Sequence, residues 1–385
     1  MGDRIFEKPK HLSFKEMSIG MQNLSRQDLD RITVKLEEFM RYSQKVKPQD
    51  SYLIVNRNSP VLTRSAQEAA EKLGLDVSIY LLDSKEPYEH FPAELIALLR
   101  QKTPKAGMGL FDYSAHPDWS LKEVGARIEL LHKVIEEVPI SWAHSPGITL
   151  DMALNGALQC DYREMVEKSE KLLRELRGVT KLRITAPGGT DLTVQIPEDV
   201  VFDTDCVIVP PNVYGGAGRF GNLPVGEVWS QRDKIIQAVN KQTGEAETQS
   251  YPVKHPADGV LVCDVAAGGY QGKIDPTEPL NATFRDGVLT DLQCADPALI
   301  GVIEDIRGAE VKYGLPTVLE EVGIGLNDKA RVTGNMLEDE KIRGTCHLAP
   351  GNIRCHVDML VSKPTITGFC NDGAVKDIMR NGVLL

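Results

Sequence analysis

Three short segments in the last third of the chain guide the interpretation of its fold: EEVGIGLN at 320–327, GTCHLAPGN at 344–352 and CHVDMLV at 355–361. They contain two of the eight histidines, His347 and His356. Asp358 follows His356 by two positions, so on a single strand both side chains point to the same face. An imidazole and a carboxylate on one face form half of a transition-metal site. We expect His347 and Glu321 to complete that site if the chain folds back on itself.

Length and composition predict two domains of a globular protein. The chain has 385 residues, of which 42% are hydrophobic and 26% charged, and its formal net charge is −11. This charge argues against a nucleic-acid partner, because phosphate binding needs a basic surface. No apolar run reaches the roughly 20 residues of a membrane span, and the first residues lack a signal-peptide core. Because the seven cysteines are scattered, with no C-x-x-C pair, we expect reduced thiols in a cytoplasmic protein.

The first half of the chain alternates between strand and helix patterns, after a polar helix expected within 24–40. Apolar segments predict buried strands at 51–55, 77–82, 107–111 and 140–143. Periodic segments predict helices at 62–73, 91–99, 121–137 and 161–176. Such alternation requires right-handed crossovers and produces a parallel sheet covered on both faces. Arg177-Gly178 is a helix stop, so we place an α/β domain at 1–178.

The second half, 179–385, has a different pattern. Turn signals at 187–191, 285–287, 372–373 and 381–382 separate short strand patterns, which predicts hairpins. One helix is expected at 297–306. We therefore predict a mainly β (α+β) domain that carries the metal site.

A glycine-rich segment, VYGGAGRFGNLPVGEVW, occupies 213–229. Its spacing loosely resembles a dinucleotide-binding motif, but it follows Pro210-Pro211 and precedes more loop, so the required strand and helix are missing. Two alternatives remain: a surface loop, or a loop whose glycines let the backbone approach a substrate and deliver Glu227 into the site. In the second case Arg219 and Asn222 are candidate substrate-binding residues.

Five residues make up the candidate metal site: Glu227, Glu321, His347, His356 and Asp358. The site would have no net charge with three carboxylates, two neutral imidazoles, two divalent ions and one hydroxide. A buried site tolerates a zero net charge best. Two ions about 4 Å apart can share a hydroxide and stabilise a tetrahedral oxyanion, which is the chemistry of amide hydrolysis. Each residue alone also fits an ordinary role, as an exposed glutamate, a hydrogen-bonded core histidine or a His–Asp pair without metal.

At these residues the sequence resembles the aminopeptidase T family of metallo-aminopeptidases. Asn222–Val228 is similar to the family's Asn-x-Pro-Thr-Glu-Glu-Val element and Leu319–Val322 to its Leu-Gly-Glu-Val element. Cys346–Gly351 resembles Cys-His-Leu-Ala-Leu-Gly, and His356–Met359 resembles His-Val-Asp-Phe. The resemblance implies an α/β N-terminal domain, a dinuclear zinc or cobalt site and a homodimer. It also implies hydrolysis of an N-terminal peptide bond or a small amide.

Two departures from the family pattern bear on the reaction. The family's catalytic tyrosine follows the first histidine by seven residues, and the matching position here is Arg354. The family also has a long insertion between its two histidine motifs, which this chain lacks. We expect Arg354 to stabilise an oxyanion or bind a substrate carboxylate. Glu321 is the candidate to bridge the ions or to accept the proton of the attacking water.

Two other interpretations stay open. Two histidines and one carboxylate also describe the Fe(II) site of non-haem oxygenases. The chain is distantly similar to 2,5-dihydroxypyridine dioxygenases, which implies ring cleavage with Fe(II). Glu227 and Glu321 argue against it, because a single iron does not need both. The third interpretation is a non-catalytic protein that kept the fold. In both catalytic interpretations the partner is a small molecule or a short peptide.

Overall fold

The computed structural model of the protein describes residues 24–82, 92–101, 105–112, 131, 133–269, 273–353 and 355–385. The described residues form two compact units. The first unit comprises those of Met1–Val166 with Asp205–Pro224, and the second comprises Glu167–Thr204 with Val225–Leu385. The division expected from the sequence, 1–178 and 179–385, contains no such return of the chain and stays a prediction. Within the described ranges, no helix is both long and apolar enough to cross a membrane.

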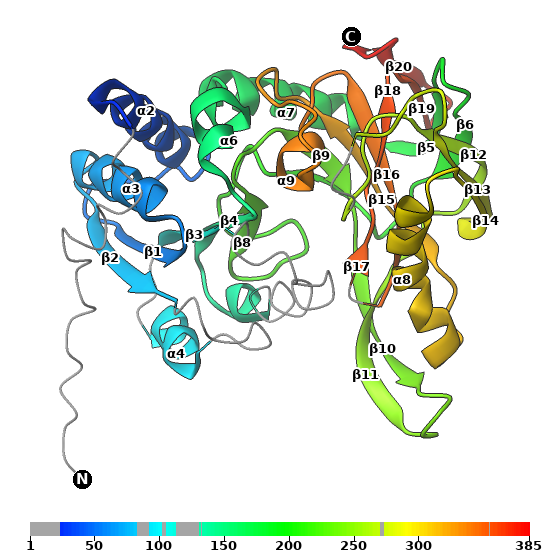
Figure 1. The fold of residues 1–385 in the computed structure, drawn as a ribbon, viewed down its shortest axis with the longest axis horizontal. Helices are drawn as coiled ribbons and strands as arrows, with labels where there is room; N and C mark the ends of the chain where they lie inside the picture. The colour runs from blue at the N-terminus through cyan, green and yellow to red at the C-terminus, as the bar shows by residue number, and fades with distance from the viewer. Residues whose placement is uncertain are drawn as a thin grey trace. The chain divides into compact units, whose positions relative to one another are not determined.

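The first unit is built on a five-stranded sheet with the order β2-β1-β3-β4-β8 (Figure 1). All of its pairings are parallel. The strands are β1 (Ser51–Arg57), β2 (Asp76–Leu81), β3 (Ala106–Phe111), β4 (Ser141–Pro146) and β8 (Arg219–Asn222). The parallel α/β architecture expected for the N-terminal part is confirmed.

Helices cover both faces of this sheet. Leu53 and Val55 of β1 pack with Leu95 and Leu99 of one helix and with Trp142 of β4 in one core, and the alternate β1 residues are buried on the opposite face. The helices of the first unit are α2 (Arg26–Tyr42), α3 (Pro60–Lys72), α4 (Ala93–Gln101), α6 (Leu150–Asn155) and the short η1 (Ala157–Gln159). Helix α7 (Tyr162–Leu176) begins in the first unit and continues into the second. Of the helix expected at 121–137, residues 131 and 133–137 are described, and they are helical.

The second unit contains a 14-stranded antiparallel sheet, which confirms the mainly β character expected there. Its main path has the order β17-β16-β15-β14-β13-β12-β6-β5-β19-β20-β21. Off this path, β18 pairs with β16, β9 pairs with β15, and β7 pairs with β9. The strands from the first part of this unit are β5 (Val179–Thr185), β6 (Asp191–Gln195), β7 (Phe202–Thr204), β9 (Glu227–Ser230), β12 (Ala257–Cys263), β13 (Leu280–Arg285) and β14 (Val288–Gln293). The remaining strands are β15 (Val318–Gly325), β16 (Thr345–Asn352), β17 (Cys355–His356), β18 (Met359–Ser362), β19 (Thr365–Cys370), β20 (Val375–Arg380) and β21 (Val383–Leu384).

Three further elements complete the second unit. A separate antiparallel hairpin joins β10 (Asp233–Val239) to β11 (Ala246–Pro252). The longer helix, α8 (Pro297–Tyr313), extends well past the expected 297–306 and ends at Gly314 in the left-handed conformation. The short helix α9 (Met336–Asp339) lies in the connection from β15 to β16.

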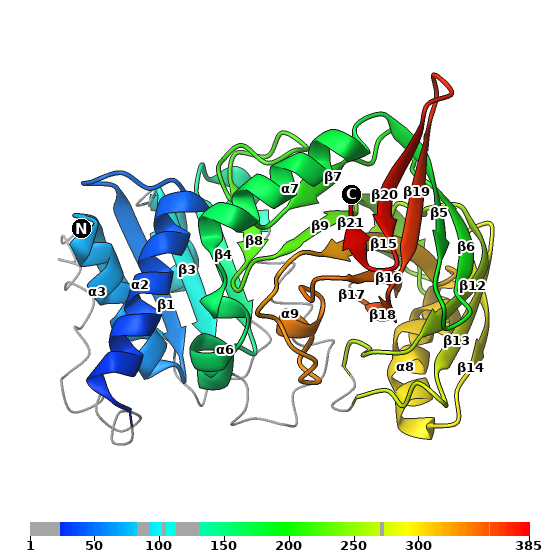
Figure 2. The same ribbon diagram turned by 90° about the horizontal axis from the view of Figure 1, so that it is seen from above.

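Strands β15 and β16 position the candidate site. Every residue of both strands is buried. β9 pairs with β15, and both β17 and β18 pair with β16 (Figure 2). Glu227, Glu321, His347 and His356 therefore lie on four neighbouring strands of one sheet.

Two local expectations are corrected by the structure. The segment 213–229 is not one loop, because β8 pairs with β4 and β9 pairs with β15. His356 and Asp358 do not share a strand, since β17 ends at His356 and β18 begins at Met359. The backbone between them bonds in two directions: Val357 donates its N–H to Pro350, and the Asp358 carbonyl accepts from Gly268.

Candidate metal centre

Three adjacent strands bring Glu227, Glu321 and His347 together. The Nε2 atom of His347 lies 3.1 Å from Oε1 of Glu321 and 3.3 Å from Oε2 of Glu227. All three residues are buried. We call this set the inner group.

Glycine at position 323 makes room for the inner group. Gly323 lies directly opposite His347 in the pairing of β15 with β16. A Cβ atom at Gly323 would come within 1.9 Å of Nε2 of His347, so the imidazole occupies the space that a side chain would need. The Val-Gly-Ile-Gly sequence of β15 therefore allows an imidazole to lie over the strand.

Glu321, His356 and Asp358 form a second set, which we call the outer group. The Nε2 atom of His356 lies 3.7 Å from Oε2 of Glu321 and 3.6 Å from Oδ1 of Asp358. The His356 side chain is 26% exposed, whereas that of His347 has no exposed surface. Solvent therefore reaches the outer group and not the inner histidine.

Glu321 belongs to both groups and uses a different oxygen in each. In each group the ligand atoms of the three residues lie within 4.8 Å of one another, and no further group of this kind is found in the described part of the chain. All five residues expected as metal ligands are thus in one cluster. Arg219 and Asn222 lie on β8 of the first unit. Arg354 lies outside the described residues.

The cluster also contains charged residues that the sequence analysis did not assign to the site. Lys341 is fully buried, and its ammonium group contacts the carboxylates of Glu227 and Glu340. Glu320 is buried as well and accepts a hydrogen bond from the side chain of Gln231. Neither Lys341 nor Glu320 could be assigned to the site from the sequence pattern, because charged runs are usually exposed to solvent.

The carboxylates outnumber the cations of the cluster. Five carboxylates and one ammonium leave four negative charges when both imidazoles are neutral, and two divalent ions would balance them. The carboxylates are those of Glu227, Glu320, Glu321, Glu340 and Asp358, and the ammonium is that of Lys341.

This excess charge changes the pKa values of both histidines. Burial alone would lower the pKa of His347, but the hydrogen bond to Glu321 and the charges of Glu227 and Asp358 outweigh burial and raise that pKa to about 9. Burial likewise opposes the charged form of His356, yet Glu320 and Asp358 raise its pKa well above the ordinary value. The carboxylates of the metal-free cluster therefore favour the protonated form of both rings.

The donor atoms fit divalent metal ions. Nε2 of His347 can carry only one hydrogen, but carboxylate oxygens of both Glu321 and Glu227 lie close to it. A single N–H cannot form a good hydrogen bond to both oxygens. The buried Oδ1 of Asp358 has no hydrogen-bond partner among the residues that the structure describes. Metal–ligand bonds of about 2 Å place neighbouring donors roughly 3 Å apart, close to the 3.1–3.7 Å separations found here. Imidazole nitrogen and carboxylate oxygen are common ligands of zinc, cobalt and iron.

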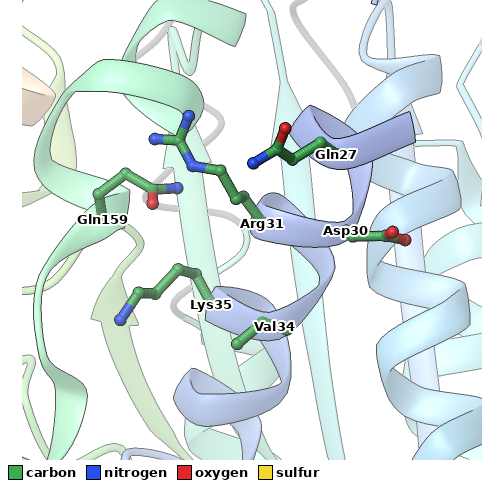
Figure 3. A pocket seen from close by; sticks show the side chains of 6 residues that line it. All are labelled: Gln27, Asp30, Arg31, Val34, Lys35 and Gln159. Carbon is green, nitrogen blue, oxygen red and sulfur yellow. The ribbon is translucent and has the colours of Figure 1, made fainter. Parts of the chain in front are cut away.

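The first unit has a surface pocket of about 400 Å³ on α2 and η1, lined by Gln27, Asp30, Arg31, Val34, Lys35 and Gln159 (Figure 3). Its carboxylate, Asp30, pairs with Arg26 at 3.0 Å, and Lys35 pairs with Glu38 at 2.7 Å. These charges are satisfied by neighbours on the same helix, so the pocket is a weaker candidate for chemistry than the cluster.

Comparison with known proteins identifies the fold. No protein-family model matches the sequence, and no curated protein matches it. AmpT from Thermus thermophilus has a similar structure, with a TM-score of 0.60 and 17% identity, over 92% of this chain and 99% of AmpT. A 2,5-dihydroxypyridine dioxygenase from Pseudomonas putida is also similar, with a TM-score of 0.58 and 15% identity, over 93% of this chain and 97% of that enzyme. Two kinds of enzyme with different names thus share this fold.

Proposed function

We propose that this chain is a metal-dependent hydrolase that cleaves an N-terminal peptide bond or a small amide, with zinc or cobalt as its ions. The observation that carries the proposal is the position of Glu321, whose two carboxylate oxygens approach different histidines. Glu227 and His347 would hold one ion, His356 and Asp358 the other, and Glu321 would bridge them. A carboxylate between two ions about 4 Å apart is the arrangement that dinuclear hydrolysis requires.

The ions and the residues of the cluster would have different roles in this reaction. Two divalent ions, when bound, polarise a carbonyl group and lower the pKa of a water molecule. Glu321 would bridge the ions in this arrangement; accepting the proton of the attacking water is the alternative role for it, since a carboxylate with both oxygens on metal ions is a poor base. The substrate approaches over the outer group, because His356 is the partly exposed histidine.

The proposal also includes Arg354, Arg219 and Asn222. On the sequence pattern alone, Arg354 is proposed to stabilise the oxyanion, and Arg219 and Asn222 to bind the substrate. A homodimer in the cytoplasm, acting on a short peptide or another small molecule, remains part of the same proposal.

A ring-cleaving dioxygenase with one Fe(II) is the second candidate. A specific observation favours it: His347 and His356 both approach Glu321, at 3.1 and 3.7 Å, which is a set of two histidines and one carboxylate. The likeness to the dioxygenase is almost as strong as that to AmpT. Buried Glu227 and Asp358 favour the hydrolase, since a single iron held by two histidines and Glu321 does not need these two further carboxylates.

The two functions are separated by one pair of assays on the same preparation. Metal-free protein is loaded with zinc, cobalt or Fe(II), and each sample is tested for release of an amino-terminal residue and for oxygen uptake with dihydroxypyridines. We expect hydrolysis with zinc or cobalt and none in Glu321→Gln. The exposed Glu278→Gln variant is the matched control and should keep full activity. Oxygen uptake with Fe(II), without hydrolysis under any loading, would reverse the assignment.

A further inference from the structure

Glu320 reaches the metal centre because the strand that carries it is irregular. The pairing of β15 with β16 shifts register between Leu319 and Glu321. In a regular strand Glu320 and Glu321 would point to opposite faces. A bulge redirects a side chain, and here both glutamates contact the same imidazole. Oε1 of Glu320 lies 3.2 Å from Nδ1 of His356, and Oε2 of Glu321 lies 3.7 Å from its Nε2.

The surroundings of Glu320 are shaped to hold a carboxylate. A Cβ atom at Gly351 would come within 1.7 Å of Oε2 of Glu320, so glycine at this position provides the space. Gln231 donates a hydrogen bond from Nε2 to Oε1 of Glu320. Because a buried charge is costly without partners, these contacts hold Glu320 in one orientation.

The hydrogen bond to Glu320 determines which nitrogen of His356 carries hydrogen. An ionised carboxylate only accepts hydrogen bonds, so a bare Nδ1 would place two acceptors 3.2 Å apart. The amide nitrogen of Gln231 also lies 3.4 Å from Nδ1, but its much shorter contact is the hydrogen bond that it donates to Oε1 of Glu320. Nδ1 therefore carries the hydrogen, and the lone pair of the neutral ring is on Nε2. That nitrogen faces Glu321 and Asp358, as a metal ligand must. His347 differs, because its Nδ1 has no hydrogen-bond partner within the described residues.

We propose that Glu320 is a positioning residue, which fixes His356 with its hydrogen on Nδ1 and so directs Nε2 to the outer ion. The inference rests on the proposed metal centre. It predicts that the outer ion depends on a hydrogen-bond acceptor at position 320, whereas the inner ion does not.

The test compares two substitutions of similar volume in the full-length protein. Glu320→Gln keeps an oxygen that can accept from Nδ1, and Glu320→Met removes it. Zinc affinity is measured by competition with a chromophoric chelator, and the ring nitrogens of His356 are followed by nitrogen-15 NMR of the zinc-loaded protein. We expect Glu320→Met to lower the affinity for one of the two zinc ions by about 10- to 100-fold, the usual effect of losing such a hydrogen-bond partner. Glu320→Gln should restore most of that affinity, and wild type should show the hydrogen on Nδ1.

Each other outcome overturns a defined part of the proposal. Equal losses in both variants would mean that the negative charge of Glu320 acts and not its hydrogen-bond acceptor, and wild-type affinity in Glu320→Met would mean that it has no role at His356. Absence of zinc binding in wild type would instead overturn the metal centre itself, and this inference with it. Gly351→Ala provides a second test if Glu320→Met does not fold, because its Cβ excludes the Glu320 carboxylate. Gly351→Ala should also lower the affinity for the outer ion, and unchanged affinity would contradict the proposal.

Discussion

The second unit buries two histidines, His255 and His347, whose surroundings have opposite effects. Burial lowers the pKa of His255 to about 4, and the Nε2 atom of that ring lies 3.1 Å from the Ser230 hydroxyl. His347 is equally buried, but the carboxylates around it raise its pKa to about 9. His255 is therefore an ordinary neutral core histidine. The environment of His347 favours positive charge, and that difference distinguishes the candidate metal centre.

The largest effect expected from this comparison is on metal binding. His347→Gln should lose the inner ion, with affinity reduced by more than about 100-fold, beyond the range for residues that only orient a ligand. His255→Gln is the matched control and should still bind two ions. Equilibrium dialysis with zinc, followed by elemental analysis, checks both variants. Equal metal content in the two variants would remove the distinction between the histidines.

Lys341 extends the comparison, since it is a buried cation that contacts Glu227, a neighbour of His347. Lys341→Met would leave the Glu227 and Glu340 carboxylates without their shared ammonium. We expect the metal-free variant to lose about 3–5 kcal/mol in its free energy of unfolding, as when one partner of a buried pair is removed. Added zinc should recover part of the loss. Urea unfolding with and without zinc measures both effects, and unchanged stability would show that the lysine is not needed to balance the cluster.

The pH dependence of stability should have opposite signs at the two histidines. The folded pKa of His255, about 4, is below the unfolded value of 6.5, so its contribution is complete above pH 6.5 and is lost as pH falls to 4, by about 3 kcal/mol. The folded pKa of His347, about 9, is above 6.5, so in metal-free protein its contribution is present below pH 6.5 and is lost as pH rises to 9. The free energy of unfolding of His255→Gln and His347→Gln is measured across pH 4–9. His255→Gln should lose the decrease in stability on the acid side, and His347→Gln the decrease on the alkaline side. The reverse result would contradict the assignment.

The smallest effects concern two glycines of the second unit. Gly323→Ala would place a Cβ within 1.9 Å of Nε2 of His347, and should weaken the inner ion by about 10- to 100-fold. Gly301 of α8 has open space around it, so Gly301→Ala should leave zinc affinity unchanged and stabilise the helix by about 0.5–1 kcal/mol. Zinc titration and thermal unfolding of both variants check this. A Gly323→Ala protein with wild-type affinity would show that the imidazole does not need this space.

Much of the fold could be predicted from periodicity, but parts of the cluster could not. Alternating apolar and periodic segments predicted the parallel sheet of the first unit, because its strands are buried on both faces. The bulge that turns Glu320 toward His356 depends on pairing with β16, and no local signal reports it. The run Glu338–Lys341 is typical of an exposed turn, yet Glu338, Asp339 and Lys341 are fully buried. Glu338 and Asp339 bind Arg331 and Thr333 nearby in the chain, whereas Lys341 contacts Glu227 from a distant position.

The segments that carry the candidate ligands could be recognised in the sequence for a physical reason. Each segment with a candidate ligand contains small or apolar residues, which allow it to be buried in neighbouring strands. The single strand expected for His356 and Asp358 was wrong, although their side chains still meet, at 3.6 Å. The residues that cluster could thus be selected from the sequence, whereas the backbone path that joins them required the structure.

The central claim is that this cluster binds two divalent ions bridged by Glu321. The most direct measurement is the metal content of untagged wild-type protein and of Glu321→Gln, after dialysis against limiting zinc and against cobalt. The account predicts two ions per chain in wild type and strong loss of both in the variant, because each group loses its shared ligand. Fewer than one ion per wild-type chain, or a single iron that remains in Glu321→Gln, would contradict it.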